Sequence, residues 1–177
     1  MPKIFNVSIY PFQENELIEY CEGVLLHDNQ RKIMYVNIHV LNMAYKDVIL
    51  QNSLQSADRI YCDGEGVRLG AKILREKFPI RTTGADWIYD LCELCQKKKY
   101  SIYFLGGKPS VALNAAKIMR QLYPDLIIAG AADGYFNTES EENEQRIKLI
   151  NDSKADILLV GLGTPLQEVD YSELSKN

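Results

Sequence analysis

Short hydrophobic runs alternate with amphipathic stretches along most of the chain. The hydrophobic runs end at polar or glycine residues, which is typical of buried strands. They predict strands at residues 32–37, 59–62, 101–105, 126–129 and 157–160. The amphipathic stretches predict helices at residues 14–26, 41–54, 64–76, 84–98, 110–122 and 139–151. Strands separated by single helices indicate βαβ units. We therefore expect an α/β fold, one domain over residues 1–177 whose parallel sheet has helices on both faces.

Composition is that of a globular protein. The chain has 177 residues, 46% hydrophobic, and a net charge of -4, which allows a substantial core and excludes intrinsic disorder. No apolar run approaches the ~20 residues that span a bilayer, and the N-terminus lacks the apolar core of a signal peptide. An isoelectric point near 5.3 argues against nucleic-acid binding. We expect a cytoplasmic protein with no nucleic-acid partner.

Two cysteines form a C-x-x-C motif, Cys92 and Cys95. Redox pairs of this kind normally lie at a helix N-terminus, where the helix dipole lowers the pKa of the thiol. Here both cysteines fall late in a helical pattern, on the side that repeats every three to four residues. The pattern predicts that they pack in the core. The sequence offers no second C-x-x-C or H-x-x-x-H with which to build a zinc site.

Polar residues follow the first two predicted strands, at the edge of a parallel sheet where ligands bind. Asn37 and His39 follow the first strand, and such residues either cap the next helix or contact a substrate. Asp63 closes the second strand. It is placed equally well to cap a helix or to act as a general base.

Three further segments carry polar or glycine residues in similar positions. Arg81 precedes a helix, where an arginine and free N–H groups favour an anion. Gly106 and Gly107 permit close approach of the backbone to a phosphate or a sugar. Their pattern is neither G-x-G-x-x-G nor a Walker motif, which argues against a dehydrogenase. The amide of Gln167 can both donate and accept, as a nucleobase edge requires. The residues alone predict a nucleotide pocket with one well-placed carboxylate.

Taken in order, five segments resemble the WecG/TagA/CpsF family of bacterial glycosyltransferases. The resemblance runs from about residue 32 to residue 168 and is carried by ADRIYCDGEGV (57–67), RTTGADW (81–87), YFLGGKPSVA (103–112), DGYF (133–136) and VGLGTPLQE (160–168). It implies a Rossmann-like domain and an inverting transferase with no metal cofactor. Such an enzyme moves N-acetylmannosamine or a related hexose from a UDP-sugar to an undecaprenyl-diphosphate-linked sugar, at the inner face of the cell membrane.

The resemblance also implies roles for particular residues. Asp63 matches the catalytic base of the family. Donor binding is implied for Arg81, Gly106, Gly107, Gln167 and Glu168. Asn37 and His39 stand where the family typically has T-x-N, and they are expected to contact the acceptor or the sugar.

The end of the sequence departs from the family pattern. Family chains continue past Q-E into an Arg-rich segment associated with membrane docking, and residues 169–177 do not resemble that continuation. We therefore expect a chain without this segment, with peripheral membrane contact in a full-length form. Apolar surface left uncovered would favour a homo-oligomer. A protein of another class, a nucleotide-sugar-binding remnant or assembly protein without catalysis, is the alternative.

Overall fold

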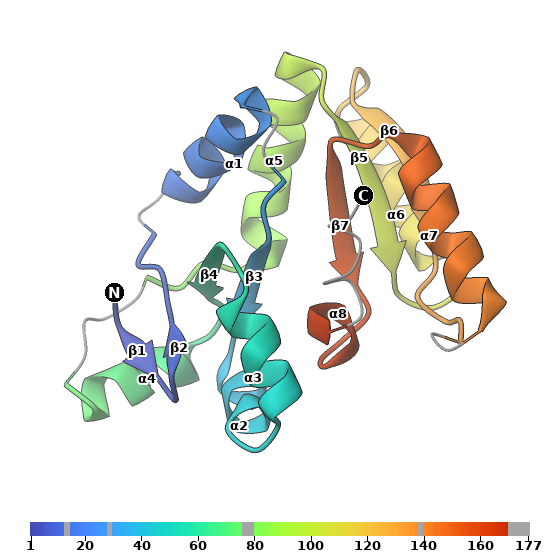
Figure 1. Ribbon diagram of the computed structural model, residues 1–177. Coiled ribbons are helices and arrows are strands. Elements are labelled where there is room, and N and C mark those ends of the chain that lie inside the picture. The colour runs from blue at the N-terminus through green and yellow to red at the C-terminus, as the bar shows by residue number, and fades with distance from the viewer. Residues whose placement is uncertain (13–14, 28–29, 76–79, 138–139, 170–177) are drawn as a thin grey trace. The chain divides into compact units, whose positions relative to one another are not determined.

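The computed structural model of the chain describes residues 1–12, 15–27, 30–75, 80–137 and 140–169. The chain forms two compact units, unit 1 over Met1–Ile88 and unit 2 over Tyr89–Asn177 (Figure 1). Each unit combines helices with parallel strands. The α/β class and the parallel pairing are therefore confirmed, although the hydrogen-bonded strands of the described residues form two parallel sheets where the sequence predicted one.

Unit 1 holds the N-terminal elements. These are β1 (Lys3–Ile4), β2 (Val7–Ser8), α1 (Glu16–Leu26), β3 (Ile33–Val36), α2 (Ile38–Ala44), α3 (Val48–Gln55), β4 (Arg59–Cys62) and α4 (Glu65–Ile73). Helix α5 (Gly84–Lys98) begins in unit 1 and ends in unit 2. β3 and β4 pair in parallel, from Ile33 opposite Arg59 to Val36 opposite Cys62. The core packs around this pair and includes the fully buried side chains of Ile9, Val36, Leu41, Leu50, Leu54 and Val67.

The helix predicted over residues 41–54 was wrong as a single element, because the chain forms two helices there. α2 begins at Ile38 because the side chain of Asn37 caps it, accepting a hydrogen bond from the N–H of Val40 at 3.0 Å. α3 begins at Val48 because the carboxylate of Asp47 accepts from two N–H groups of its first turn. A side chain that satisfies free N–H groups lets a helix start anew.

An N-terminal β-hairpin was missing from the sequence prediction. β1 and β2 pair antiparallel across Phe5 and Asn6, both with positive φ, 47° and 64°. Two such residues in succession make the tight turn whose twist matches that of the two strands. Asparagine favours this backbone, so Asn6 was the available signal. The hairpin adds Ile4 and Val7 to the core of unit 1.

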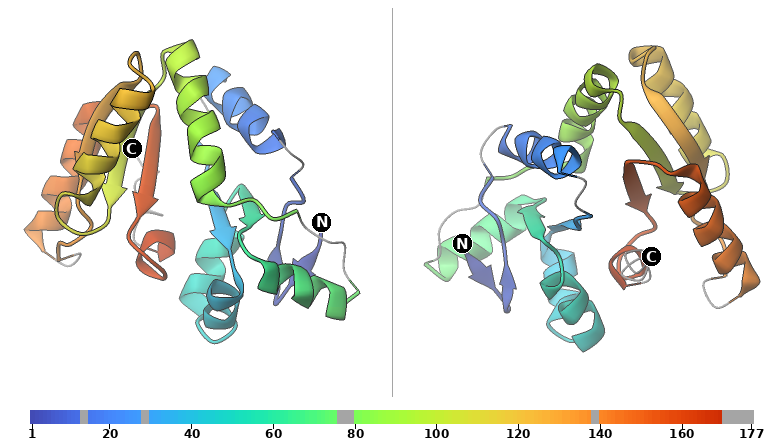
Figure 2. Two further views of the ribbon diagram at one scale, coloured as in Figure 1. Left: turned by 180° about the vertical axis from the view of Figure 1, so that it is seen from behind. Right: turned by 45° about the horizontal axis from the view of Figure 1, so that its top comes forward.

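Unit 2 is a three-stranded parallel sheet between helices. Its elements are β5 (Ser101–Gly106), α6 (Val111–Leu122), β6 (Ile127–Ala132), α7 (Glu141–Ser153), β7 (Ile157–Gly161) and α8 (Leu166–Val169), and the strand order is β6-β5-β7. Tyr103 and Leu105 of β5 pack with Ile150 of α7. Figures 1 and 2 show α6 on the opposite face of the sheet. In this unit the prediction of helices on both faces is confirmed.

Chain order and strand order together place a topological switch point in unit 2, between β5 and β7. From β5 the chain crosses through α6 to β6 on one side, and then through α7 to β7 on the other side of β5. At such a reversal the loops leaving the two neighbouring strands diverge, and ligands bind beyond the carboxyl ends of the strands. The loops after β5 and β7 therefore flank the expected position for a ligand.

The C-x-x-C motif is structural. Cys92 and Cys95 lie in the third and fourth turns of α5, and both side chains are fully buried. Burial raises the pKa of the Cys92 thiol to about 11, which opposes formation of a thiolate. The prediction of core packing is confirmed.

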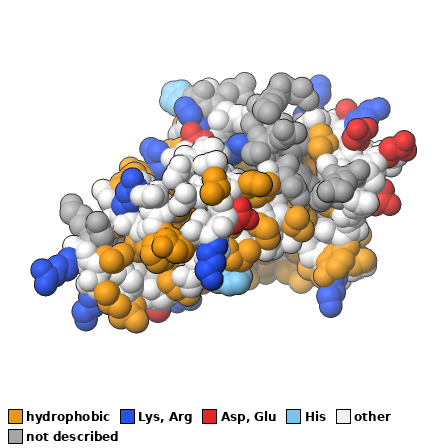
Figure 3. All heavy atoms as spheres, turned by 60° about the horizontal axis from the view of Figure 1, so that its bottom comes forward, with side chains coloured by type: hydrophobic (Ala, Val, Ile, Leu, Met, Phe, Trp, Pro, Cys, Tyr) orange, Lys and Arg blue, Asp and Glu red, His pale blue; other side chains and the backbone are white. Residues whose placement is uncertain are grey.

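Apolar side chains also remain on the surface of unit 1. Tyr45, Val48, Ile49 and Ile73 each expose about two thirds of their surface or more, at 67%, 67%, 66% and 73%. Figure 3 shows hydrophobic side chains exposed at several places on the side of the molecule that it views. Exposed apolar surface commonly marks an interaction site where it is contiguous.

Candidate active site

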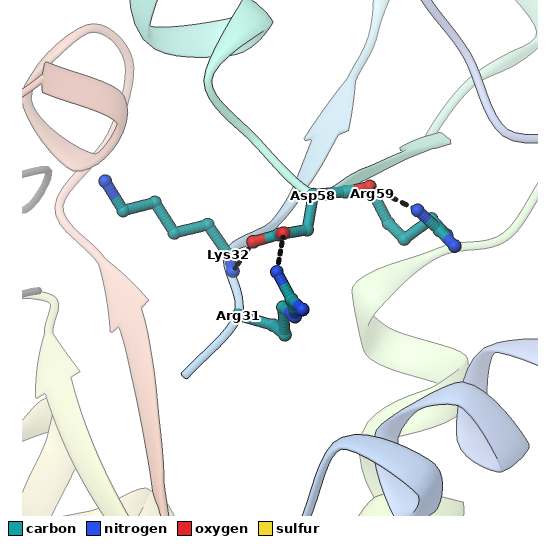
Figure 4. Close-up of polar contacts among 4 residues, drawn as sticks. All are labelled: Arg31, Lys32, Asp58 and Arg59. Atoms are coloured by element: carbon teal, nitrogen blue, oxygen red, sulfur yellow. Dashed lines mark hydrogen bonds and ion pairs between the residues drawn. The ribbon is translucent and has the colours of Figure 1, made fainter. Parts of the chain in front are cut away.

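A cluster of charged residues at the amino end of β4 is structural. Figure 4 shows Asp58 between the side chain of Arg31 and the backbone of Lys32, and its carboxylate accepts from each at 2.8 Å. The guanidinium of Arg59 donates to the carbonyl of Asp58 at 2.7 Å and stacks 4.6 Å from the ring centres of Tyr10 and Tyr20. These contacts tie the start of β4 to the chain just before β3. The chemistry predicted from the sequence lies at the other end of both strands.

At the carboxyl ends of β3 and β4, the structure brings together two of the predicted residues of unit 1. The N–H of Asp63 donates to the carbonyl of Val36 at 2.9 Å, which fixes Asp63 beside the end of β3. Arg81 forms a parallel bridge with Cys62, the last residue of β4, and the next N–H donates to the Cys62 carbonyl at 2.8 Å. Asp63 and Arg81 are therefore held in adjacent backbone segments by hydrogen bonds to β3 and β4.

The surroundings of Asp63 alter the acidity of its carboxyl. Its carboxyl is half-buried, and desolvation raises its pKa above the ordinary value. The positive charge of Arg81 lowers this pKa, while the carboxylate of Asp86 raises it. A carboxylate with a raised pKa binds a proton more strongly than an ordinary aspartate, which improves it as a base. The N-cap residue of α4 is Gly64, the residue after Asp63, and it makes no side-chain cap.

The two residues after β3 differ in their surroundings. Asn37 is half-buried, and its side-chain oxygen is occupied by the cap of α2. It lies close to the Asp63 loop, since a Cβ on Gly64 would stand 3.6 Å from the Cβ of Asn37. His39 lies one residue into α2 with an exposed side chain. The capping function of Asn37 is thus observed, and the substrate contacts of both residues stay predictions.

In unit 2, three glycines lie where the backbones of β5 and β7 approach each other. Gly106 ends β5 with φ 143°, and a Cβ there would stand 2.2 Å from the carbonyl oxygen of Gly161 in β7. Gly107 follows with φ 69°, and its N–H donates to the same carbonyl at 3.1 Å. We name Gly106, Gly107 and Gly161 the glycine cradle. Because Gly106 has no side chain, the backbones of β5 and β7 can approach each other closely at this point.

A third loop joins this cradle, and sequence reasoning gave its residues no function. The N–H of Gly134, after β6, donates to the carbonyl of Gly107 at 2.9 Å. Asp133 accepts from the N–H of Tyr135 at 3.0 Å and lies 3.7 Å from the guanidinium of Arg146, on α7. Arg146 also stacks 4.8 Å from the ring centre of Phe136. Arg146 thus anchors the β6 loop against the cradle. The DGYF segment was the available signal, whereas the arginine is distant in sequence.

The family model "Glycosyl transferase WecG/TagA/CpsF family" matches residues 2–176 of the chain. The chain belongs to this family. A relative from Bacillus subtilis (strain 168) is 28% identical over 162 residues, covering 89% of this chain and 62% of the relative. One from Bacillus spizizenii (strain ATCC 23059 / NRRL B-14472 / W23) is 31% identical over 161 residues, covering 89% and 61%. Both are named N-acetylglucosaminyldiphosphoundecaprenol N-acetyl-beta-D-mannosaminyltransferase. The chain spans about three-fifths of the length of these relatives.

The Q-E pair of this family member organises the loop after β7. The side-chain oxygen of Gln167 accepts from the N–H of Gly163 at 3.1 Å, and its amide nitrogen donates to Glu168 at 2.9 Å. Glu168 is 2% exposed and also accepts from the hydroxyl of Thr164 at 3.0 Å. Glu168 therefore holds the loop from inside. Gln167 is half-buried and nearer the surface, and donor binding by either residue stays a prediction.

The predicted site residues thus form two groups, one in each unit. Asn37, His39, Asp63 and Arg81 lie in unit 1, and Gly106, Gly107, Gln167 and Glu168 lie in unit 2. Over the described ranges, no three His, Cys, Asp or Glu side chains lie close enough together to hold a metal ion. Among the helices of those ranges, none has the length and apolar character needed to cross a bilayer.

Proposed function

We propose that this chain carries the sugar-transfer activity named for its relatives. The donor is a UDP-sugar, N-acetylmannosamine or a related hexose. The acceptor is an undecaprenyl-diphosphate-linked sugar at the cytoplasmic face of the membrane. The proposal is supported by the family match over residues 2–176 and by the printed names of the two Bacillus relatives.

The observation that carries the proposal is the setting of Asp63. Its carboxyl lies at the carboxyl edge of β3 and β4, half-buried, with the cationic Arg81 on the adjacent segment. Desolvation raises the pKa of Asp63, and the positive charge of Arg81 acts against that rise. A structural helix cap would need neither the burial nor the cation.

In the proposed reaction, the carboxylate of Asp63 removes the proton from the acceptor hydroxyl. That oxygen attacks the anomeric carbon of the donor sugar. A new C–O bond forms as the bond between the anomeric carbon and the diphosphate oxygen breaks, and UDP leaves with the bonding electron pair. A single displacement inverts the configuration at the anomeric carbon. Arg81 offers positive charge for the departing diphosphate, so the scheme assigns no step to a metal cofactor.

Unit 2 is proposed to bind the nucleotide of the donor. The glycine cradle lies at the carboxyl ends of β5 and β7, and ligands of parallel sheets bind beyond such strand ends. Gln167 lies in α8, and its side-chain oxygen accepts from the N–H of Gly163, in the loop after β7. Donor binding and proton removal are thus assigned to different sets of residues, and they can be tested separately.

The test is transfer of N-acetylmannosamine from its UDP donor to a short-chain lipid-linked N-acetylglucosamine. We expect transfer by the wild-type chain and a loss of roughly 10²–10⁴-fold for Asp63→Asn, the range for removal of a general base. Asp152→Asn, which removes an exposed carboxylate from α7, serves as the matched control and keeps the wild-type rate. UDP binding, followed by calorimetry, should be equal in all three proteins.

Each contrary result has a definite meaning. Full activity of Asp63→Asn would remove that residue from the chemistry. A chain that binds UDP but transfers nothing would support the binding-only alternative. A folded wild-type chain that binds neither UDP nor a UDP-sugar would contradict the proposed function.

A further inference from the structure

We infer that one face of unit 1 docks onto an anionic lipid surface. This apolar face consists of Phe5, Ile38, Tyr45, Val48, Ile49, Ile73 and Leu74, each exposed by 40% or more. The inference deepens the proposed function, on which it rests, because an acceptor linked to a polyprenyl chain must be met at a bilayer. It assigns the contact with the bilayer to the residues of this apolar face.

The side chains of the face are contiguous. The rings of Phe5 and Tyr45 lie 5.0 Å apart, centre to centre, and the side chain of Gln51 on α3 donates to the carbonyl of Phe5 at 3.2 Å. Phe5, Tyr45 and Leu74 line one open hollow of ≈ 610 Å³. The turn of the hairpin thus lies between the end of α4 and the segment that contains Tyr45 and α3.

Helix α4 extends the face toward α2. Gly66 and Ile73 are seven residues apart, so they lie on the same side of the helix. A Cβ on Gly66 would stand 3.0 Å from Ile38, the first residue of α2. Ile73 is therefore on the same face of α4 as Gly66, which lies next to α2, and not on the face that carries the buried Val67 and Ala71.

The charges around the face select an anionic partner. The segments that form it, residues 1–12, 45–51 and 65–75, carry Lys3, Lys46, Arg68, Lys72 and Arg75 against Asp47 and Glu65. Glu65 pairs with Arg68 at 2.8 Å, so these two charges offset each other, and four cations stand against the carboxylate of Asp47, which caps α3. The face is positive on a chain whose net charge is -4. Figure 3 shows lysine and arginine side chains beside the hydrophobic ones.

These features favour a bilayer over a second copy of the chain. A symmetric dimer through this face would bring two positively charged faces together, which is unfavourable. Aliphatic side chains bordered by lysine, with a tyrosine among them, are suited to the headgroup region of a membrane. The α2–α3 and α4 elements and the hairpin turn also lie beyond the carboxyl ends of β3 and β4, the edge that carries Asp63 (Figure 1).

The test is cosedimentation of the full chain with vesicles of phosphatidylglycerol, compared with vesicles of phosphatidylcholine. We expect binding to the anionic vesicles that weakens as salt rises. Lys46→Gln/Lys72→Gln should bind roughly 25-fold more weakly, about fivefold for each charge. Val48→Gln/Ile49→Gln should weaken binding to both kinds of vesicle.

Matched controls come from the exposed surface of unit 2. Lys117→Gln/Lys148→Gln removes two lysines, and Leu113→Gln/Ile118→Gln removes two apolar side chains exposed by 52% and 53%. Both controls should bind vesicles as the wild type does. UDP binding in every variant confirms that the protein is folded and tests the proposed function independently.

Three results would overturn the inference. They are a wild-type chain that binds UDP but not anionic vesicles, vesicle binding that the unit 1 variants leave unchanged, and control variants that lose as much binding as the unit 1 variants. A loss of self-association in Val48→Gln/Ile49→Gln with unchanged vesicle binding would make the face an interface between copies. Vesicle binding without UDP binding would support the docking face and count against the proposed function.

Discussion

Replacing Gly106 by alanine tests whether the close approach of β5 and β7 is required. At φ 143° the backbone of this residue lies in a region that is open essentially to glycine, and a side chain there costs about 1–3 kcal/mol of strain. A Cβ would also stand 2.2 Å from the oxygen, 2.6 Å from the carbon and 2.8 Å from the Cα of Gly161. All three contacts are with backbone, which moves only if the β5–β7 pairing shifts.

The two effects add to a substantial loss of stability. Overpacking of this kind costs about 1–3 kcal/mol, so Gly106→Ala should destabilise unit 2 by about 4 kcal/mol in all. For a chain of this length, that lowers the Tm by roughly 8–16 °C. The assay is thermal unfolding followed by circular dichroism, with UDP binding measured on the folded protein. Movement of β5 away from β7 should also break the hydrogen bond from the N–H of Gly107 to the carbonyl of Gly161 and weaken the binding of UDP.

Substitutions at two other glycines separate the cost of backbone strain from the cost of steric contact. Gly163 has φ 81°, and a Cβ placed on it would have nothing within 4 Å, so Gly163→Ala should cost only the strain, about 1–2 kcal/mol. Gly161→Ala would meet only the carbonyl of Leu105, at 3.9 Å, and should be close to neutral. A Tm for Gly106→Ala that is no lower than that of Gly163→Ala would refute the reasoning from close approach.

Three further predictions concern charge and reactivity. Since burial raises the pKa of Asp63, ionisation of this group opposes folding as the pH rises through that pKa. Asp63→Asn should therefore raise the Tm at neutral pH but not in acid. The acid limb of the wild-type transfer profile should lie above the pH range of an ordinary aspartate. Arg146→Met should weaken UDP binding about fivefold, through loss of ~1 kcal/mol of loop anchoring, while Lys148→Gln on the same helix leaves it unchanged in calorimetry. Cys92 and Cys95 should resist a thiol reagent until the protein unfolds, and rapid labelling of the native protein would contradict their burial.

Local pattern and chain order predicted most of the secondary structure. Continuous apolar runs marked β3 through β7 because a strand buried on both faces has no polar side to reveal an alternation. Asp63 and the glycines after β5 were found because strand ends can be located from the same runs, and Arg81 was found because it precedes the helix predicted at residues 84–98. The α5 cysteines were assigned to the core from helical spacing alone, and their complete burial agrees.

What the sequence could not supply depends on contacts between distant segments. Asp47 divides one expected helix into two because its carboxylate satisfies free N–H groups, and this local effect competes with a continuous hydrophobic pattern. Arg146 reaches the DGYF loop only after α7 has folded back on the sheet.

By itself, the sequence determined the α/β class, the family and the identity of the candidate base, because these are written in periodicity and in short ordered motifs. Only the tertiary structure decided which backbones touch. The cradle exists because the strand order β6-β5-β7 brings Gly106 against Gly161, 55 residues away in the chain. The raised pKa of Asp63 likewise arises from burial and from neighbouring charges that the folded chain brings to the end of β4. Pairing, burial and electrostatic environment are properties of distances in space, and the linear order of residues does not specify them.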